Sequence, residues 1–177
     1  MHEQIVCAGF GGQGIMLMGK LLAEVGMKEG FSVTWMPSYG AEVRGGTAHS
    51  MVHISDQKIA SPTILEPTTC IAMNKPSFEK FKEKIQHKGL LVVNTSMVDK
   101  ILEKKSVRIA AFPFTELASE LGNIKTANMI AIGALVKLKN LFPLKSVSQE
   151  LSRMMSYKKE IIALNKKAVE LGYNLPV

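Results

Sequence analysis

A glycine-rich turn between an apolar segment and an amphipathic segment restricts the fold of this chain more than any other feature. Residues 4–9, QIVCAG, are typical of a buried strand, and Gly9-Phe10-Gly11-Gly12-Gln13-Gly14 follows with the spacing G-x-G-x-x-G. Residues 14–29 then place apolar side chains on one helical stripe, and Gly30 ends that helix. A strand, a glycine turn and a helix in this order predict the first unit of an α/β sheet.

The rest of the chain continues this alternation. Further strands are expected at 31–36, 47–55, 70–73, 90–93 and 107–111, with a short one at 58–60. Helices are expected at 76–87, 97–104, 114–121, 127–138, 145–155 and 158–171, with Gly172 capping the last. The pattern predicts one domain, residues 1–177, with a Rossmann-like three-layer α/β sandwich. Its sheet should be mainly parallel or mixed, with helices on both faces, and the helix-free strands in 31–73 favour a mixed edge.

Composition excludes several classes of protein. Hydrophobic residues make up 46% of the 177 residues, which is typical of a folded chain. No apolar run approaches the roughly 20 residues that cross a bilayer, and the first residues lack a signal-peptide pattern, so a cytoplasmic location without membrane contact is expected. The two cysteines, Cys7 and Cys70, lie in separate apolar runs. Buried, unreactive thiols are expected there, and no metal site.

Charge is distributed unevenly along the chain. Residues 1–74 hold four Lys and Arg against six Asp and Glu, a net charge of −2, whereas the remaining residues hold 18 against nine, a net charge of +9. Solvated helix faces explain such a distribution, and so does a patch for an acidic partner or a polyphosphate ligand. Nucleic acid is not expected, because the basic stretches carry no interleaved stacking aromatics.

The first glycine loop has the properties of an anion site. Glycines let backbone amides approach an anion closely, and a helix N-terminus adds unpaired N–H groups with a partial positive charge. A nicotinamide site would also need an acidic residue at the end of the second strand, and residues 31–36, FSVTWM, contain none. A phosphate or diphosphate site at Gly11, Gly12, Gln13 and Gly14 is therefore predicted, and a tight turn without a ligand is the alternative.

A second glycine-rich loop, residues 39–46 (YGAEVRGG), should lie at the same sheet edge. Arg44 offers a fork of donors for phosphate or carboxylate, and Glu42 is placed to orient it. An internal Glu42–Arg44 pair that stiffens the loop is the alternative. His49 and His53 follow four residues apart on one strand face. A metal site requires a third ligand, so structural histidines are expected.

Taken together, the two loops make the chain resemble the gamma subunit of 2-oxoacid:ferredoxin oxidoreductases. The segments that carry the resemblance are residues 9–14 (GFGGQG), 38–46 (SYGAEVRGG) and 54–56 (ISD), with Ile59, Ser61, Pro62, Asn128-Met129, residues 133–135 and the tail positions Asn165, Ala168 and Gly172. The run 35–40 (WMPSYG) is most similar to the 2-oxoglutarate type, with the pyruvate and 2-oxoisovalerate types as alternatives.

The resemblance implies a role in a multi-subunit enzyme. Such enzymes decarboxylate a 2-oxoacid on thiamine diphosphate with Mg, pass two electrons through iron–sulfur clusters to ferredoxin, and form acyl-coenzyme A. Alpha and beta subunits, and a ferredoxin-like delta subunit, hold those cofactors. The gamma subunit helps to bind coenzyme A and to close the active site.

These implications assign roles to particular residues. Gly11, Gly12, Gln13, Gly14 and Asn128 are assigned to coenzyme A, whereas Glu42 and Arg44 line the partner's active site. For Asn128, a buried capping role is equally compatible with the sequence. Two other functions stay open: a stand-alone oxidoreductase that uses NAD or flavin, and a purely structural assembly subunit.

Overall fold

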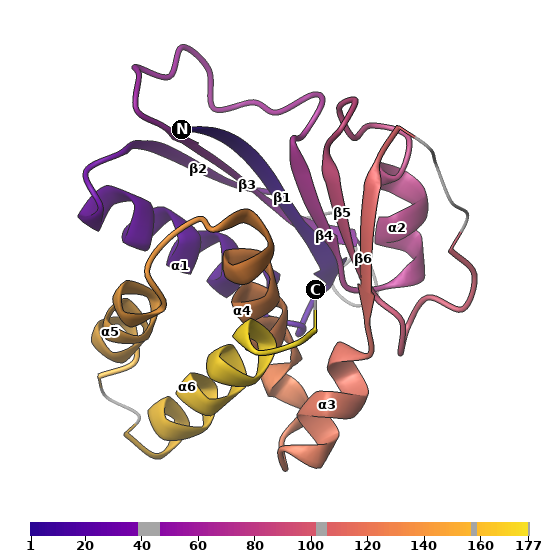
Figure 1. Ribbon diagram of the computed structural model, residues 1–177, viewed down its shortest axis with the longest axis vertical. Helices are drawn as coiled ribbons and strands as arrows, with labels where there is room; N and C mark the ends of the chain where they lie inside the picture. Colours follow the sequence, from indigo (N-terminus) through magenta and orange to yellow (C-terminus); the bar gives the residue numbers. More distant parts are fainter. Residues whose placement is uncertain (39–46, 102–105, 157–158, 177) are drawn as a thin grey trace.

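The computed structural model describes residues 1–38, 47–101, 106–156 and 159–176. They form a six-stranded mixed sheet with helices on both faces, so the predicted fold class is confirmed (Figure 1). The strand bounds are β1 His2–Phe10, β2 Ser32–Ser38, β3 Thr47–Ser55, β4 Thr69–Ala72, β5 Leu90–Asn94 and β6 Arg108–Phe112. The helix bounds are α1 Ile15–Lys28, α2 Lys75–Phe81, α3 Phe114–Glu120, α4 Ala127–Lys139, α5 Leu144–Met154 and α6 Lys159–Tyr173, with a 3-10 turn, η1, at Ile124–Thr126.

The strand order is β2-β3-β1-β4-β5-β6. Strands β1, β4, β5 and β6 are parallel, whereas β3 runs antiparallel to both β1 and β2. The expected mixed edge is therefore confirmed. Because β3 is inserted beside β1, its first residue, Thr47, pairs with Phe10 at the entrance to the glycine loop.

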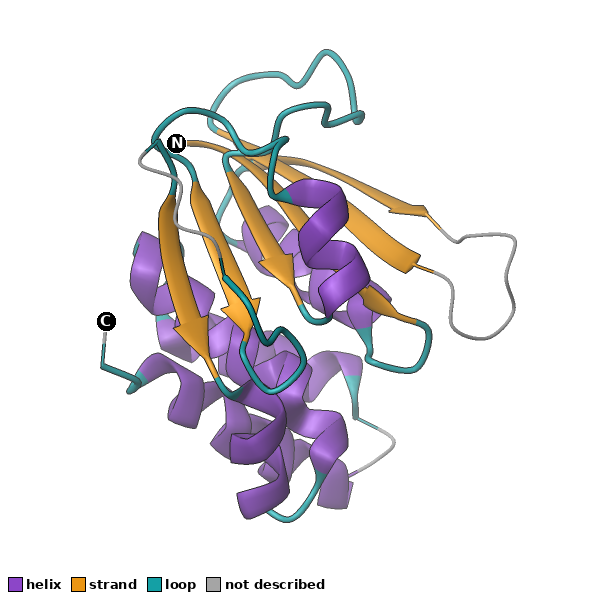
Figure 2. Cartoon of the chain, turned by 90° about the vertical axis from the view of Figure 1, so that its right-hand side faces the viewer, coloured by secondary structure: helices purple, strands orange, loops and turns teal. Residues whose placement is uncertain are grey.

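Two apolar layers enclose the sheet. On one face, alternate residues of β1 such as Ile5 and Cys7 pack with α1, α4, α5 and α6, while on the other face Val6 and Ala8 pack with α2 (Figure 2). Ten successive residues of α4, from Ala127 to Val136, are buried, as expected for a helix that is apolar nearly all round. None of the described helices is long and apolar enough to cross a membrane.

Three predicted helices or strands differ from the structure in the described residues. No strand forms at 58–60, because no other strand pairs with these residues. Helix α2 ends at Phe81 rather than at 87, since Gln86 bonds Pro67 and Lys88 bonds Ser106, which draws the chain into β5. Residues 97–101 are not helical; the rest of the expected helix at 97–104 includes residues outside the described ranges.

Gly172 does not cap the last helix but lies inside α6, where it faces α4. A Cβ atom added to Gly172 would come within 1.9 Å of the Ile130 carbonyl oxygen, and one added to Gly133 would come within 2.0 Å of the Val169 carbonyl oxygen. The two helices therefore pack with backbone against backbone, which only glycine permits at these positions. Gly30 does fulfil its expected role, ending α1 at a φ of 85°.

Helices α1 and α5 are joined by a buried carboxylate. The side chain of Glu150 is fully buried; it forms an ion pair with Lys28 at 2.7 Å and accepts a hydrogen bond from Arg153 at 2.6 Å. Arg153 also contacts Glu24 at 2.7 Å. Burial raises the pKa of Glu150, but the hydrogen bonds from Lys28 and Arg153 outweigh burial and hold that pKa below its usual value.

We expect Gly172→Ala to lower the free energy of unfolding by about 1–3 kcal/mol, because its methyl group collides with the backbone of α4. Urea unfolding followed by circular dichroism measures this loss. Gly11→Ala is the matched control, since a Cβ atom there meets nothing within 4 Å. Equal stability of the two variants would contradict the backbone contact between α4 and α6.

We expect the stability advantage of the wild type over Glu150→Gln to shrink in acid. The folded chain holds the Glu150 proton less tightly than the unfolded chain, so the carboxylate stabilises the fold above its unfolded pKa, about 4.3. That contribution is lost as pH falls through the lower, folded pKa. Urea midpoints of both proteins at neutral pH and below pH 4 measure the effect; an advantage that is independent of pH would contradict the assignment.

Candidate functional site at the glycine loop

The glycine loop lies at the carboxyl ends of the parallel strands, between Phe10 at the end of β1 and Ile15 at the start of α1. Open α/β sheets bind ligands at this edge. Strands β2 and β3 contribute to it as well, because Ser38 pairs with His49 and Thr47 pairs with Phe10. Ser38 and Thr47, the described residues on either side of the second loop, therefore lie at the same edge of the sheet as the glycine loop. Its predicted site residues, Glu42 and Arg44, lie outside the described residues.

Three backbone amides of the glycine loop lack a partner. Within the described residues, the N–H groups of Gly11, Gly12 and Gly14 have no hydrogen-bond acceptor. Gly11 and Gly12 are exposed, and a Cβ atom added to either would meet nothing within 4 Å. Gly12 has a φ of 98° and Gly14 a φ of 72°, which glycine adopts without strain. The amides of Gly11 and Gly12 therefore border open space.

The N-terminus of α1 adds to this positive potential. Gly14 is the capping residue and provides no side-chain acceptor, and the first turn contains no acidic residue. The first N–H groups of an α-helix have no partner within the helix and carry a partial positive charge. An anion bound next to Gly11 and Gly12 would give the unpartnered N–H groups an acceptor and would balance the partial positive charge of the helix N-terminus.

Gln13 has a different role from its glycine neighbours, because its side chain is bonded within the protein. Its Oε1 accepts from the Phe10 amide at 2.7 Å and from Asn74 Nδ2 at 3.2 Å, while its Nε2 donates to the Met73 carbonyl at 3.3 Å. Its own amide donates to the Phe10 carbonyl at 3.2 Å. Gln13 thus fixes the shape of the loop, and the amides open to a ligand are those of Gly11 and Gly12.

Asn128 meets the glycine loop from α4. Its Nδ2 donates to the Gly14 carbonyl at 3.4 Å, and a Cβ atom on Gly14 would lie 2.1 Å from the same nitrogen. The side chain is 4% exposed, and its Oδ1 is buried without a hydrogen-bond partner in the described part of the chain. Asn128 therefore holds Gly14 from the side of α4, and its Oδ1 is left without a hydrogen-bond donor among the described residues.

Two further asparagines, which sequence analysis missed, extend this polar layer along the sheet edge. Asn74, fully buried, caps α2 by accepting from the Ser77 amide at 2.9 Å. Asn94, also fully buried, donates to the Met73 carbonyl at 3.2 Å and to Thr115 Oγ1 at 2.8 Å. Asn74 follows β4 and Asn94 ends β5. A polar residue directly after an apolar strand was the sequence signal that could have identified them.

Within the described residues, no three His, Cys, Asp or Glu side chains converge around the histidines of β3. The His53 ring lies with its Nε2 3.4 Å from His2 Nε2, and the His49 ring meets Phe81 edge to face at 5.4 Å. Burial is the largest cause that lowers the pKa of both histidines, and Lys80 and Lys84 lower that of His49 further. Both rings are therefore neutral at pH 7.

The cysteines are buried free thiols, as predicted. Cys7 and Cys70 lie on the neighbouring strands β1 and β4 but pack on opposite faces of the sheet. Burial raises the pKa of Cys7 to about 12 and that of Cys70 well above its usual value. Neither thiol is a nucleophile at neutral pH.

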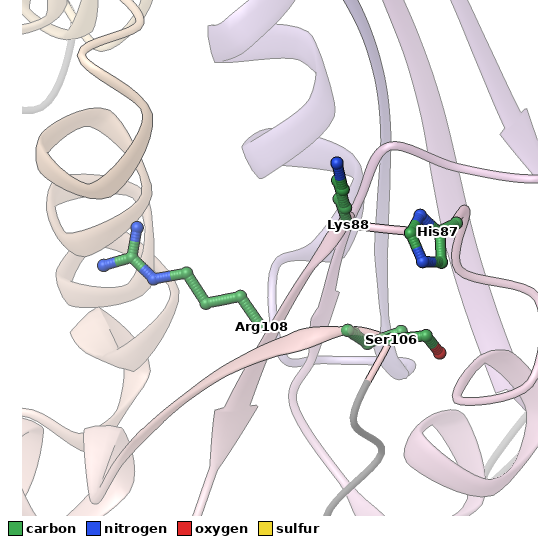
Figure 3. A pocket seen from close by; sticks show the side chains of 5 residues that line it. His87, Lys88, Ser106 and Arg108 are labelled. Atoms are coloured by element: carbon green, nitrogen blue, oxygen red, sulfur yellow. The ribbon is translucent and has the colours of Figure 1, made fainter.

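A surface pocket of about 410 Å³ lies at the opposite edge of the sheet, where β5 and β6 begin. His87, Lys88, Ser106, Val107 and Arg108 line it. Figure 3 shows the Arg108 side chain pointing away from His87, so these basic groups do not converge on one ligand. The Lys88 amide donates to the Ser106 carbonyl at 2.7 Å, with Lys88 at a φ of 63°. This pocket is separate from the glycine loop.

Comparison with known proteins places the chain in a family. The family described as pyruvate ferredoxin/flavodoxin oxidoreductase matches residues 4–175. The ketoisovalerate oxidoreductase subunit VorA of Methanothermobacter marburgensis is 33% identical over 174 residues, covering 96% of this chain and 35% of that protein. This chain therefore spans about a third of the length of VorA. The 2-oxoglutarate synthase subunit KorC of Methanocaldococcus jannaschii is 33% identical over 153 residues, covering 84% of this chain and 81% of KorC.

Solved structures agree with the sequence comparisons. A keto/oxoacid ferredoxin oxidoreductase gamma subunit from Geobacter sulfurreducens superposes with a TM-score of 0.83 at 26% identity, covering 97% of this chain and 96% of that one. The 2-oxoglutarate:ferredoxin oxidoreductase of Magnetococcus marinus, with 2-oxoglutarate, coenzyme A and succinyl-CoA bound, superposes with a TM-score of 0.88 at 27% identity, covering 97% of this chain and 30% of that chain. Sequence motifs, fold and relatives thus agree that the chain belongs to the pyruvate ferredoxin/flavodoxin oxidoreductase family.

Proposed function

We propose that this chain is the gamma subunit of a 2-oxoacid:ferredoxin oxidoreductase and that its glycine loop binds the diphosphate of coenzyme A. The observation that carries the proposal is the pair of unpartnered amides at Gly11 and Gly12, which border open space next to the N-terminus of α1. A diphosphate fits such a site, since it offers several anionic oxygens to converging N–H donors. The Magnetococcus marinus relative with coenzyme A bound supports the same ligand.

In this proposal the chain contributes binding and positioning rather than bond chemistry. The assembled enzyme decarboxylates a 2-oxoacid to CO2 and an acyl group, which coenzyme A accepts as a thioester while two electrons pass to ferredoxin. Thiamine diphosphate, Mg and iron–sulfur clusters would belong to alpha, beta and delta partners. Gln13 holds the loop in shape, and Asn128 supports Gly14 from beneath. Glu42 and Arg44 are proposed to line the entry to the partner's active site.

The proposed substrate is 2-oxoglutarate. The sequence of residues 35–40 favours it, and both KorC and the Magnetococcus marinus enzyme carry 2-oxoglutarate in their names. The related VorA subunit is named for ketoisovalerate. Assaying the reconstituted complex with 2-oxoglutarate, pyruvate and 2-oxoisovalerate decides among them.

The fold weighs against a stand-alone nicotinamide enzyme. In dinucleotide-binding sheets the strand after the first helix lies beside β1 and ends in the acidic residue that holds the ribose. Here β3 separates β2 from β1, and no acidic residue occurs in β2. The ribose-binding position next to the glycine loop is therefore occupied by an antiparallel strand.

We expect Gly11→Asp to weaken coenzyme A binding to the reconstituted complex at least about tenfold, which corresponds to about 1.4 kcal/mol. The added carboxylate would repel the diphosphate, and the site has room for the side chain because a Cβ atom at Gly11 meets nothing within 4 Å. Gly11→Asn is the matched control, with the same shape and no charge. Isothermal titration calorimetry measures both affinities.

Unchanged coenzyme A affinity in Gly11→Asp would refute the loop assignment. If that variant also assembled and turned over normally, the glycine loop would serve only the assembly of the complex.

A further inference from the structure

Two histidines meet at the edge of the sheet opposite the glycine loop. Strand β1 begins at His2 and ends at Phe10, so His2 lies at the far end of that strand from the loop (Figure 1). His53 lies on the neighbouring strand β3, where it pairs with Gln4, two residues after His2. Because side chains alternate between the two faces along a strand, His2, Gln4 and His53 lie on the same face of the sheet.

The ring nitrogens of this pair are spaced like two ligands of one metal ion. His2 Nε2 and His53 Nε2 lie 3.4 Å apart, and the two rings cross at 77° rather than stack. This separation is longer than the about 2.7–3.2 Å of protein N–H···O hydrogen bonds. Two Zn–N bonds of about 2.0–2.1 Å that meet at the tetrahedral angle separate their nitrogens by about 3.4 Å. The geometry therefore favours a shared ion over a direct hydrogen bond between the rings.

Gln4 is placed to supply a third ligand. Its Nε2 also lies 3.4 Å from His2 Nε2. Turning the side-chain amide by half a turn about its last torsion exchanges the nitrogen and the oxygen, which have nearly the same shape, and brings Oε1 to this position. In the part of the chain that the structure describes, no third His, Cys, Asp or Glu side chain joins the pair. A neutral amide oxygen and water would therefore complete the coordination of the ion.

The surroundings of the pair are compatible with a cation. Burial lowers the pKa of His53 most, so its ring is neutral at pH 7, which is the form that binds metal ions. His53 is 7% exposed, whereas His2 is exposed, so the open side of the pair is that of His2. The Asp56 carboxylate, which pairs with the Met1 amine, also interacts electrostatically with His2. A negative group thus accompanies the histidines.

We propose that His2 and His53, together with the side-chain oxygen of Gln4, bind a divalent transition-metal ion, Zn²⁺ in particular. Imidazole nitrogen is a ligand that suits Zn²⁺. The ion would connect β1 to β3 at the end of the sheet that is remote from the anion site. Because both strands must be in place to form the site, binding would stabilise the folded chain.

Calorimetric titration of the metal-free full chain with zinc chloride tests the proposal, and a single site is expected. His2→Gln removes an exposed ligand and should weaken Zn²⁺ binding at least about tenfold, as should His53→Gln. His87→Gln is the matched control, because His87 is exposed, as His2 is, and lies at the pocket where β5 and β6 begin. This control should bind Zn²⁺ as the wild type does, and circular dichroism checks that each variant keeps its fold.

Proton–nitrogen NMR spectra of the imidazole rings give a readout that a purely structural histidine pair would not change. Zn²⁺ should shift the Nε2 resonances of His2 and His53 together, while those of His49 and His87 stay in place. A shift at His2 alone would reveal a single surface ligand and would overturn the shared site, as would Zn²⁺ affinity that His2→Gln leaves unchanged. Neither measurement involves coenzyme A, so the result is independent of the proposed function.

Discussion

The side-chain amide of Gln13 is the contact on which the candidate site depends. One oxygen accepts from Phe10 and Asn74, and the nitrogen donates to the Met73 carbonyl, so a single residue joins the end of β1 to the end of β4. These bonds close the glycine loop on its protein side. Because the loop's inner polar groups are satisfied there, the amides of Gly11 and Gly12 are left facing solvent. The loop is therefore shaped before any ligand arrives, which lowers the entropic cost of binding.

Much of the fold was predictable because local patterns determine it. The apolar run at 4–9, the glycine spacing after it and the helical stripe in 14–29 all act within a few residues, and the structure has β1, the loop and α1 there. The position of β3 between β1 and β2 was not predictable in the same way. Strand order depends on which edges pair over long sequence separations, and periodicity carries no information about that choice.

The site was only partly predictable for a related reason. Glycines at 11, 12 and 14 are visible in a sequence because their spacing is characteristic, whereas the partners of Gln13 are not. Gln13 was grouped with its glycine neighbours, yet its contacts lie sixty residues away at Met73 and Asn74. Gly172 was interpreted as a cap because it follows an apolar stripe, but its role depends on the distance to α4. Such contacts appear only once the helices and strands are packed.

The close approach of α4 and α6 has a consequence for the far end of the molecule. Gly172 rests on the carbonyl of Ile130, and Asn128, half a turn earlier on the same helix, touches Gly14. The buried helix α4 thus contacts the C-terminal helix on one side and the glycine loop on another. A displacement of α6 would reach the glycine loop through the backbone contact at Gly172 and the side-chain contact of Asn128 with Gly14. The packing of α6 and the shape of the glycine loop are therefore linked through α4, because a close-packed interior transmits strain.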